Sequence, residues 1–330
     1  MHPDNKTAIL FDMRAPDFGA PAARLYDEAL KMAAFADEIG IGRIGLMEHH
    51  GSEDGYLPAP FVLGGGVAAR TKRMRISLGA VILPLHDPVK IAEQIAVLDL
   101  MSGGRLDVTF GAGYVPSEFA RFGVSLKDRG RLLDQGIDII LRSLRGERFE
   151  VDGREIFVRP LPVQKPEEIL MAGGGVEASA RRAARFGIGL CPMRNELFEL
   201  YDEECRKLGR QPGRKYGSGM PMAIHVSEDP EKGWNEIKAH AVHVASAYSV
   251  WASEASNSSS PFEGLVDEEG LRQSGMFAVW TPDEVVANAA AIHANNCGLN
   301  FMPLLGGLSP DIGWKCLELV RDKVMPRLPG

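Results

Sequence analysis

Short apolar runs alternate with longer amphipathic stretches along the whole chain. At the start, Thr7–Phe11 is a run of apolar and β-branched residues, and the stretch from about Arg24 to Ile39 places apolar side chains at helical spacing until Gly40. The same alternation returns again and again toward the C-terminus. This pattern predicts repeated βα units built around a parallel sheet.

About eight such units can be counted on this strand and helix pattern. The predicted strands are Thr7–Phe11, Ile44–Met47, Arg75–Leu83, Arg105–Phe110, Ile169–Ala172, Ile188–Leu190, Met220–Val226 and Gly298–Pro303. The predicted helices are Arg24–Ile39, Phe61–Arg70, Pro88–Met101, Arg129–Leu144, Glu177–Phe186, Glu196–Leu208 and Asp311–Val324. In addition, Phe149–Phe157 carries two alternating runs around Asp152-Gly153, which predicts a β-hairpin that decorates the barrel.

One stretch interrupts the repeat, between Trp251 and Gly275. It is rich in Ser, Gly and acidic residues and poor in aliphatic ones. A loop of this length in a compact domain is usually functional or disordered, so we expect either a solvated insertion or a mobile lid over the active site. The sequence therefore predicts an α/β fold, a single (β/α)8 TIM barrel over residues 1–330, with a long insertion loop at about 252–275 before the last βα unit.

Composition and charge favour a protein that acts on small molecules. The chain is 45% apolar and 25% charged, as in an average globular protein, and its 37 basic against 44 acidic residues give a net charge of −7. This charge offers no electrostatic reason to bind a nucleic acid or an anionic membrane. The cysteines are scattered and form no C-x-x-C pair, no apolar segment is long enough to span a bilayer, and the N-terminus lacks a secretory pattern. We therefore expect a cytoplasmic protein.

The ends of the predicted strands are where a barrel of this kind carries its chemistry. Directly after Ile44–Met47 the sequence places Glu48, His49 and His50 in a row. Three adjacent titratable groups are costly to bury, and histidine can exchange protons near neutral pH. A polar surface turn is the alternative, but the cluster at a strand end favours a catalytic site.

A metal site is the next alternative for the same residues. The adjacent side chains of His49 and His50 project in different directions from an extended backbone, and neither H-E-x-x-H nor H-x-H occurs. His86 could add a ligand, but the Asp87-Pro88 pair beside it is explained as a helix start that Asp87 caps. We therefore predict no metal ion.

Two glycine runs have different settings, since one follows a predicted strand and the other lies within a predicted helix. Gly173, Gly174 and Gly175 lead directly into a helix with Ser179 in its first turn, which indicates either an anion site at the helix N-terminus or a tight turn. In contrast, Gly64–Gly66 fall within a predicted helix and indicate close packing.

The segment FGAGYVPSEF resembles the start of a dinucleotide-binding motif. Gly111 and Gly113 have the right spacing, but Pro116 stands in place of the third glycine, and we expect no helix to begin there. These glycines would instead keep side chains away from a flat ligand, on which Tyr114 could stack or whose phosphate it could reach.

Taken together, these motifs resemble the bacterial luciferase-like, flavin-dependent monooxygenases. The most specific stretch runs from Glu48-His49-His50 through ISLGAVILPLHDPVKIAEQIAVLDLMSGGRLDVTFGAGY, and the closing VMPRLP is also typical. The resemblance spans nearly the whole chain. It implies a (β/α)8 barrel that holds reduced FMN, usually delivered by a separate NAD(P)H-flavin reductase, with O2 as co-substrate.

The resemblance also implies roles for individual residues. His49 matches the catalytic histidine of the luciferase α subunit and Glu48 its neighbouring acid. The Gly79-Ala80 bond, followed by Val81, matches a non-proline cis peptide beneath the flavin ring. The turn from Gly173 to Ser179, which includes Val176, matches the phosphate-binding loop.

The chain departs from the family at two positions. Gly113 stands where luciferase has a reactive cysteine, and Tyr114 stands where luciferase has an arginine that contacts the flavin phosphate. Arg181 or Arg182 could replace that cation. The resemblance favours FMN as the cofactor. The deazaflavin F420, which relatives with this barrel use, is the alternative.

The working hypothesis is a monooxygenase in which a C4a-peroxyflavin oxygenates a small organic substrate, with His49, oriented by Glu48, as acid, base or hydrogen-bond partner. The alternatives are F420-dependent hydride transfer and a non-catalytic flavin-binding protein. Relatives commonly pair as dimers through early helices, so a homodimer is expected. An apolar pocket is indicated by residues near strand ends: Phe11, Met13, Met47, Phe110 and Met193.

Overall fold

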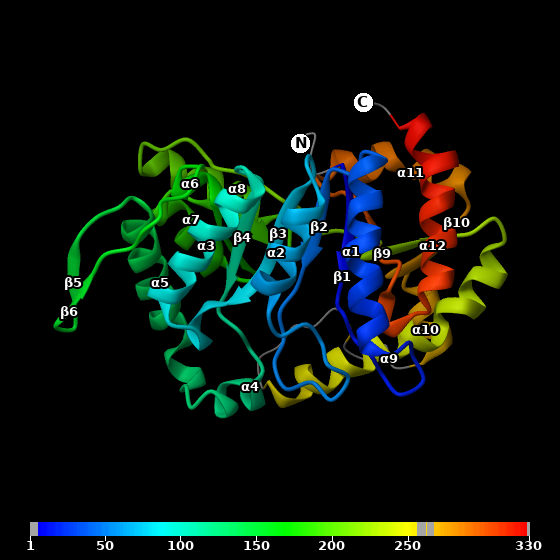
Figure 1. Ribbon diagram of the computed structural model, residues 1–330, viewed down its shortest axis with the longest axis horizontal. Helices are drawn as coiled ribbons and strands as arrows, with labels where there is room; N and C mark the ends of the chain where they lie inside the picture. Colours follow the sequence, from blue (N-terminus) through cyan, green and yellow to red (C-terminus); the bar gives the residue numbers. More distant parts are fainter. Residues whose placement is uncertain (1–5, 256–261, 263–266, 329–330) are drawn as a thin grey trace. The chain divides into compact units, whose positions relative to one another are not determined.

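The computed structural model describes residues 6–255, 262 and 267–328. The chain forms two compact units, a first unit of residues 1–58 and 218–330 and a second unit of residues 59–217. Strands and helices alternate in both units, as the hydrophobic pattern predicts (Figure 1). The prediction of one domain stays a prediction, and the two units are described in turn.

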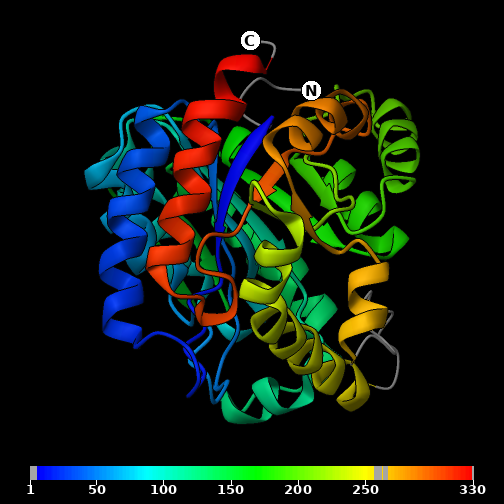
Figure 2. The same ribbon diagram turned by 90° about the vertical axis from the view of Figure 1, so that its right-hand side faces the viewer.

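The first unit contains parallel strands in the order β10-β9-β11-β1-β2. Within this order, Ile9 of β1 lies opposite both Phe301 of β11 and Ile44 of β2. Helices α1 and α12 lie side by side on the outside of these strands (Figures 1 and 2). The strands are β1 (Thr7–Phe11), β2 (Arg43–Leu46), β9 (Ala223–Val226), β10 (Phe277–Trp280) and β11 (Leu299–Phe301). The helices are α1 (Ala22–Glu38), α9 (Pro230–Glu254), α10 (Glu268–Gln273), α11 (Pro282–Ala294) and α12 (Pro310–Leu319).

The second unit contains parallel strands in the order β3-β4-β7-β8. The predicted hairpin is confirmed: β5 and β6 pair antiparallel, and Asp152 and Gly153 have the positive φ angles of 50° and 73° that a tight hairpin turn requires. The strands are β3 (Arg75–Ile82), β4 (Leu106–Gly111), β5 (Phe149–Val151), β6 (Arg154–Ile156), β7 (Leu170–Gly174) and β8 (Gly189–Pro192). The helices are α2 (Pro60–Arg70), α3 (Pro88–Ser102), α4 (Pro116–Arg121), α5 (Arg129–Leu144), α6 (Pro166–Ile169), α7 (Glu177–Phe186) and α8 (Leu197–Lys207).

Local chemistry explains where α3 begins and how it packs. The Asp87 carboxylate accepts hydrogen bonds from the backbone N–H groups of Val89 (2.8 Å) and Lys90 (3.1 Å), so the predicted cap is confirmed. On α2, a Cβ at Gly64 would lie only 3.1 Å from the Leu98 side chain of α3. The glycine therefore allows the two helices to approach closely, as the sequence indicates.

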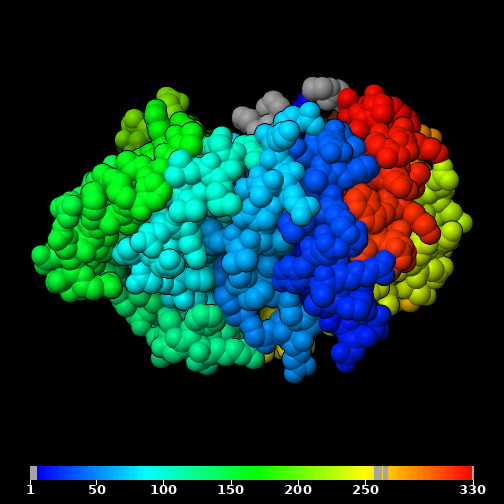
Figure 3. Space-filling view, in the orientation of Figure 1, coloured from blue at the N-terminus to red at the C-terminus, as the bar shows by residue number. Residues whose placement is uncertain are grey.

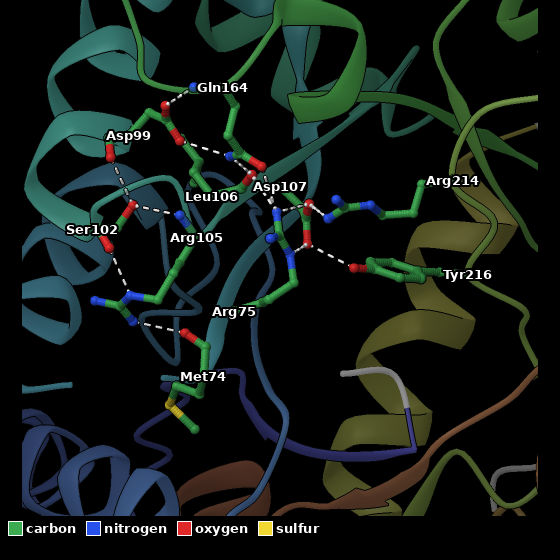
Figure 4. Close-up of polar contacts among 10 residues, drawn as sticks. All are labelled: Met74, Arg75, Asp99, Ser102, Arg105, Leu106, Asp107, Gln164, Arg214 and Tyr216. Atoms are coloured by element: carbon green, nitrogen blue, oxygen red, sulfur yellow. Dashed lines mark hydrogen bonds and ion pairs between the residues drawn. The ribbon is translucent and has the colours of Figure 1, made fainter. Parts of the chain in front are cut away.

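A buried ion-pair network joins the starts of β3 and β4 (Figure 4). Asp107 is fully buried and accepts from Arg75 Nε (2.8 Å), Arg75 Nη2 (2.6 Å) and the Tyr216 hydroxyl (2.7 Å), and it pairs with Arg214. Lys215, which lies between Arg214 and Tyr216 in the sequence, forms an isolated parallel β-bridge with Leu190 of β8. The network therefore joins the start of the strands to the segment that follows α8. In a (β/α)8 barrel, residues at the N-terminal ends of the strands contribute to stability, whereas the active site lies at the C-terminal ends.

Several elements differ from those predicted. The strand β10 and the helices α9 and α11 were not predicted, and α4 begins at Pro116, where no helix was expected. The loop predicted for about 252–275 is helical at both ends, since α9 continues to Glu254 and α10 covers Glu268–Gln273. Residues 256–261 and 263–266 of that loop lie outside the described residues. Among the helices that the structure describes, none combines the length and the apolar character needed to cross a membrane.

Candidate active site

Polar residues of the first unit gather where neighbouring parallel strands end. Asp12 directly follows β1, Glu48 follows β2, and Gly306 follows β11. The Asp12 carboxylate accepts a hydrogen bond from the Gly306 backbone N–H at 3.1 Å, which ties the ends of β1 and β11 together. The strand-end position predicted for the cluster from Glu48 to His50 therefore agrees with the structure.

Glu48 and His50 form a nearly buried pair. The Nε2 atom of His50 donates to Oε1 of Glu48 at 2.6 Å, and only 1% of the Glu48 side chain and 10% of the His50 side chain are exposed. The acid expected to orient His49 is therefore engaged with the other histidine. This pair fixes the loop that carries His49.

His49 lies inside a cluster of aromatic rings. Its ring stacks on Trp251 with centroids 4.2 Å apart and an interplanar angle of 23°, and it meets Tyr56 (4.8 Å) and Tyr248 (5.7 Å) edge-on. We call these four residues the aromatic box. Only 8% of His49 is exposed, so its imidazole is held in a setting that excludes most water.

Arg14 forms one wall of the aromatic box. Its guanidinium carbon lies 4.4 Å from the centroid of the Tyr56 ring, and one of its nitrogens pairs with the Asp54 carboxylate. Asp54 also accepts from His243 Nε2 at 2.7 Å. Burial alone would raise the pKa of Asp54, but the His243 hydrogen bond and the Arg14 charge outweigh burial and hold this pKa well below its usual range. Asp54 is therefore a carboxylate at neutral pH.

Glycines lie at or near the C-terminal ends of three strands of the second unit, at Gly79, Gly111 and Gly173. A Cβ on Gly173 would lie 2.8 Å from the Thr109 methyl group, and a Cβ on Gly111 would lie 3.0 Å from the Cβ of Ala80. The Gly79-Ala80 peptide bond is cis, as the family resemblance implies, and Val81 after it is buried. Glycine at these positions allows the neighbouring strands to pack closely, because a larger side chain would collide with Thr109 or Ala80.

The turn from β7 into α7 is the predicted phosphate loop. Gly174 has a φ of 137°, which favours glycine, and Gly175 follows it before Val176, the exposed residue at the N-cap of α7. The Ser179 hydroxyl donates to the Val176 carbonyl at 2.7 Å, so its proton is used within the turn. Arg194, which follows β8, donates to the Gly175 carbonyl at 3.0 Å. The turn thus joins a helix N-terminus with an exposed guanidinium, which suits an anionic group.

The structure distinguishes between the cations suggested for this turn. Arg181 pairs with Glu177 at 2.9 Å, and Arg182 pairs with Asp134 at 2.5 Å. Both are engaged by acids, whereas Arg194 lies at the loop itself. The sequence could have indicated Arg194, because it follows a predicted strand.

Gly113 and Tyr114 follow β4. Gly113 has a φ of 72°, and a Cβ there would lie 2.7 Å from both Ile82 and Phe119, so the backbone and packing require glycine. Tyr114 is half-buried. An anionic group of a cofactor therefore fits the second unit at the α7 turn, where the helix N-terminus and Arg194 offer positive charge.

The residues predicted to line an apolar pocket have different environments. Phe11, Met13 and Phe110 are buried, Met47 is partly buried against the core of the first unit, and Met193 is 55% exposed. Sequence reasoning missed the three rings around His49, those of Tyr56, Tyr248 and Trp251, and the linked group of Asp12, Arg14 and Asp54. Asp12, Arg14, Asp54 and Tyr56 lie in segments that follow strands and could have been found there, whereas Tyr248 on α9 gives no such signal.

Two curated relatives are monooxygenases. The chain is 33% identical over 232 residues to the N-acetyl-S-alkylcysteine monooxygenase of Bacillus subtilis, which is 65% of this chain and 66% of that protein. It is 29% identical over 192 residues to the oxygenase component of the flavin-dependent trigonelline monooxygenase of Acinetobacter baylyi, which is 56% of this chain and 52% of that protein. The chain spans about half the length of the first curated relatives that it matches.

Solved structures share the fold over nearly the whole chain. The monooxygenase RslO1 from Streptomyces bottropensis is 26% identical with a TM-score of 0.75, covering 97% of this chain and 99% of that one. The oxygenating constituent of 3,6-diketocamphane monooxygenase from Pseudomonas putida, in complex with FMN, is 20% identical with a TM-score of 0.73, covering 98% and 99%. An F420-dependent secondary alcohol dehydrogenase is 17% identical with a TM-score of 0.70, covering 98% and 100%.

These matches confirm the α/β fold of the luciferase-like (β/α)8 barrels and indicate an enzyme. The sequence profile of the luciferase-like monooxygenases matches residues 9–296, most of the chain. Flavin-dependent monooxygenases, including two-component types, are among the relatives. The chain belongs to the luciferase-like monooxygenase family.

Proposed function

We propose that this enzyme is the oxygenase of a two-component system that uses reduced FMN and O2 to oxygenate a small apolar organic substrate. A separate NAD(P)H-flavin reductase would supply the reduced FMN. The observation that carries the proposal is the enclosure of His49 by the rings of Tyr56, Tyr248 and Trp251, because oxygen transfer requires a proton donor in a site that excludes water.

In this proposal the second unit binds the flavin. Gly79, Gly111 and Gly173, at the strand ends, would lie along the ring, and the turn at Gly174, with Arg194, would hold the phosphate. When bound, reduced FMN supplies the electrons that activate O2. This assignment is supported by the helix N-terminus and Arg194 at the α7 turn, and by the FMN complex of a neighbour with the same fold.

His49 and the rings packed around it act on the reaction. The imidazole of His49 donates a proton or hydrogen bond to the reacting oxygen, and the rings of Tyr56, Tyr248 and Trp251 exclude water. Glu48 and His50 act on the position of His49, since their hydrogen bond fixes the same loop.

A His49→Ala variant tests the catalytic role. We expect turnover to fall by a factor of about 10² or more, because a positioned acid or base contributes on that order, while FMN affinity stays nearly unchanged. Turnover is measured with reductase, NAD(P)H and O2 on the substrate that a product screen identifies. His293→Ala, which alters a histidine hydrogen-bonded to the Lys6 carbonyl, is the control. Full turnover in His49→Ala would remove the assignment.

Hydride transfer with F420 is the second candidate, because an F420-dependent dehydrogenase shares the fold with a TM-score of 0.70. Mixing the enzyme anaerobically with each reduced cofactor, and then admitting O2, separates the two. An oxygen-dependent spectral change with FMN supports the monooxygenase. Reduction of oxidised F420 by an alcohol supports the dehydrogenase instead.

We also propose a homodimer that works in the cytoplasm, where NAD(P)H and the reductase would be available. Support for the dimer comes from α2 and α3, whose outward side chains Val62 (75% exposed), Val97 (45%) and Met101 (52%) are apolar. All four cysteines are free thiols, which suits a reducing compartment.

A further inference from the structure

The loop after β2 brings two rings to the aromatic box. His49 and Tyr56 lie near its two ends, and the His49 backbone N–H donates to the Leu57 carbonyl at 3.2 Å. The Leu57 N–H donates in turn to the Asp12 carbonyl at 3.0 Å, which fastens the loop to the end of β1. Residues 49–57 therefore form a loop that is closed at its base, and the contacts of its tip set how the two rings are held.

Asp54, at the tip of this loop, divides its two carboxylate oxygens between two sets of donors. Its Oδ1 atom accepts from the Ser52 hydroxyl and from the Tyr56 backbone N–H at 3.3 Å, within the loop. Its Oδ2 atom accepts from the Arg14 guanidinium and from His243 Nε2 at 2.7 Å, both outside the loop. Only 8% of Asp54 is exposed, so these four donors take the place of water around the carboxylate.

The two outside donors belong to segments that complete the surroundings of His49. Arg14 follows β1, and its guanidinium lies against the Tyr56 ring. His243 lies on α9, about two helical turns before Trp251, so its hydrogen bond to Asp54 holds the helix that carries this ring. Asp54 therefore joins the loop of His49, the segment after β1 and α9 at one carboxylate.

The arrangement of donors around Asp54 requires a carboxylate. A carboxylate offers acceptor oxygens on both sides, whereas an amide offers an oxygen on one side and N–H donors on the other. Although burial raises the pKa of Asp54, the His243 hydrogen bond and the Arg14 charge hold it well below its usual range, so the carboxylate persists at neutral pH. With asparagine at this position, either the donors within the loop or those outside it would lose their acceptor.

We propose that Asp54 is a positioning residue for His49: it ties the loop to α9 and thereby keeps Trp251 stacked on the imidazole. The inference rests on the proposed function, since it names a residue that prepares His49 for its part in the reaction. The Glu48–His50 pair holds the first residues of the same loop, whereas Asp54 holds the loop against the helix. Loss of this tie should release the His49 ring from the indole.

The position of the His49 ring can be measured by NMR on protein labelled at the Cε1 atoms of its eight histidines. The signal that is missing in His49→Ala identifies His49, and Trp251→Leu gives the position of this signal without the indole. A stacked indole shifts the imidazole proton through its ring current, so Asp54→Asn should move the His49 signal most of the way to its position in Trp251→Leu. A signal that stays where it is in the unaltered protein would overturn the inference.

Asp107→Asn is the matched control for the loss of a buried acid. Asp107 also pairs with arginines, but it belongs to the second unit, so this variant should be less stable and leave the His49 signal unmoved. An equal movement of the signal in Asp107→Asn would mean that general loosening displaces the ring, which contradicts the inference.

Two variants at His243 test the same tie without altering Asp54. His243→Gln keeps an N–H donor of similar reach and should keep the His49 signal in place. His243→Leu removes the donor and should move the signal in the same direction as Asp54→Asn. This pair decides the question if Asp54→Asn does not fold, and the same signal position in both His243 variants would contradict the inference.

Turnover then connects the position of the ring with the reaction. Asp54→Asn should lower kcat at least about tenfold, because small displacements of a catalytic group are costly, while FMN affinity stays within about twofold. Asp107→Asn should keep the kcat of the unaltered protein. Full kcat in an Asp54→Asn protein whose His49 signal has moved would contradict the inference. If the unaltered protein shows no turnover that depends on FMN and O2, the proposed function fails, and the NMR comparison still decides whether Asp54 positions His49.

Discussion

At the scale of single residues, the buried His225 on β9 makes stability depend on pH. It is 5% exposed, and its nearest acid in the described part of the chain is Glu236, 3.8 Å from its Nε2 atom. Burial lowers the pKa of His225 from 6.5 to about 4. Between these values the unfolded chain binds more protons than the folded one. The stability that the neutral histidine contributes is therefore complete above about pH 6.5 and is lost as the pH falls toward 4.

We expect a His225→Leu variant to lose this sensitivity. The fall in unfolding free energy between pH 7 and pH 4.5, measured by urea denaturation, should be smaller in the variant by roughly 2 kcal/mol. The variant's own stability at pH 7 serves as the reference, so any packing cost of leucine cancels. The same fall in both proteins would show that His225 does not set the acid response.

At the scale of elements, the ion-pair network at Asp107 should hold β3, β4 and the segment after α8 together. Asp107→Asn leaves Arg75 and Arg214 with an uncharged partner, and breaking a buried pair costs about 3 to 5 kcal/mol. Urea denaturation should show a loss of this size. Asp138→Asn on α5 alters an exposed pair with Arg142 and should change stability by less than about 0.5 kcal/mol. Equal stability of the two variants would contradict the structural role of the network.

The elements that the sequence predicted are those with local signals. β1, β3 and α3 follow from apolar runs, helical spacing and the Asp87 cap, because each signal lies within the element itself. β10 was missed, although the Thr281–Glu284 capping box marks the helix after it and could have located it.

The candidate site was predictable where it follows strands. His49 and the Gly173–Gly175 turn were selected because they directly follow predicted strands, and Arg14 could have been selected for the same reason. The stack of Trp251 on His49 was not predictable, because it joins residues far apart in the sequence and depends on how α9 packs. Tertiary packing therefore supplies the part of the site that local pattern cannot.

At the scale of the whole molecule, the outer face of α2 and α3 is the surface proposed for the dimer. It is visible in light blue and cyan in Figure 3, and it contains a shallow groove of about 400 Å³ lined by Val62, Val97 and Met101 among others. Burying these apolar side chains against a second copy would remove them from water.

We expect the purified protein to have twice the chain mass of 35.9 kDa by light scattering, and the double variant Val62→Glu with Met101→Glu to have the mass of one chain. The two carboxylates would have to lose their hydration where Val62 and Met101 meet the second copy, which costs several kcal/mol per charge. Leu208→Glu, at an exposed leucine just after α8, is the control and should leave the dimer intact. A double variant that stays dimeric would place the interface elsewhere, and an unaltered protein that is monomeric at micromolar concentration would contradict the proposed dimer.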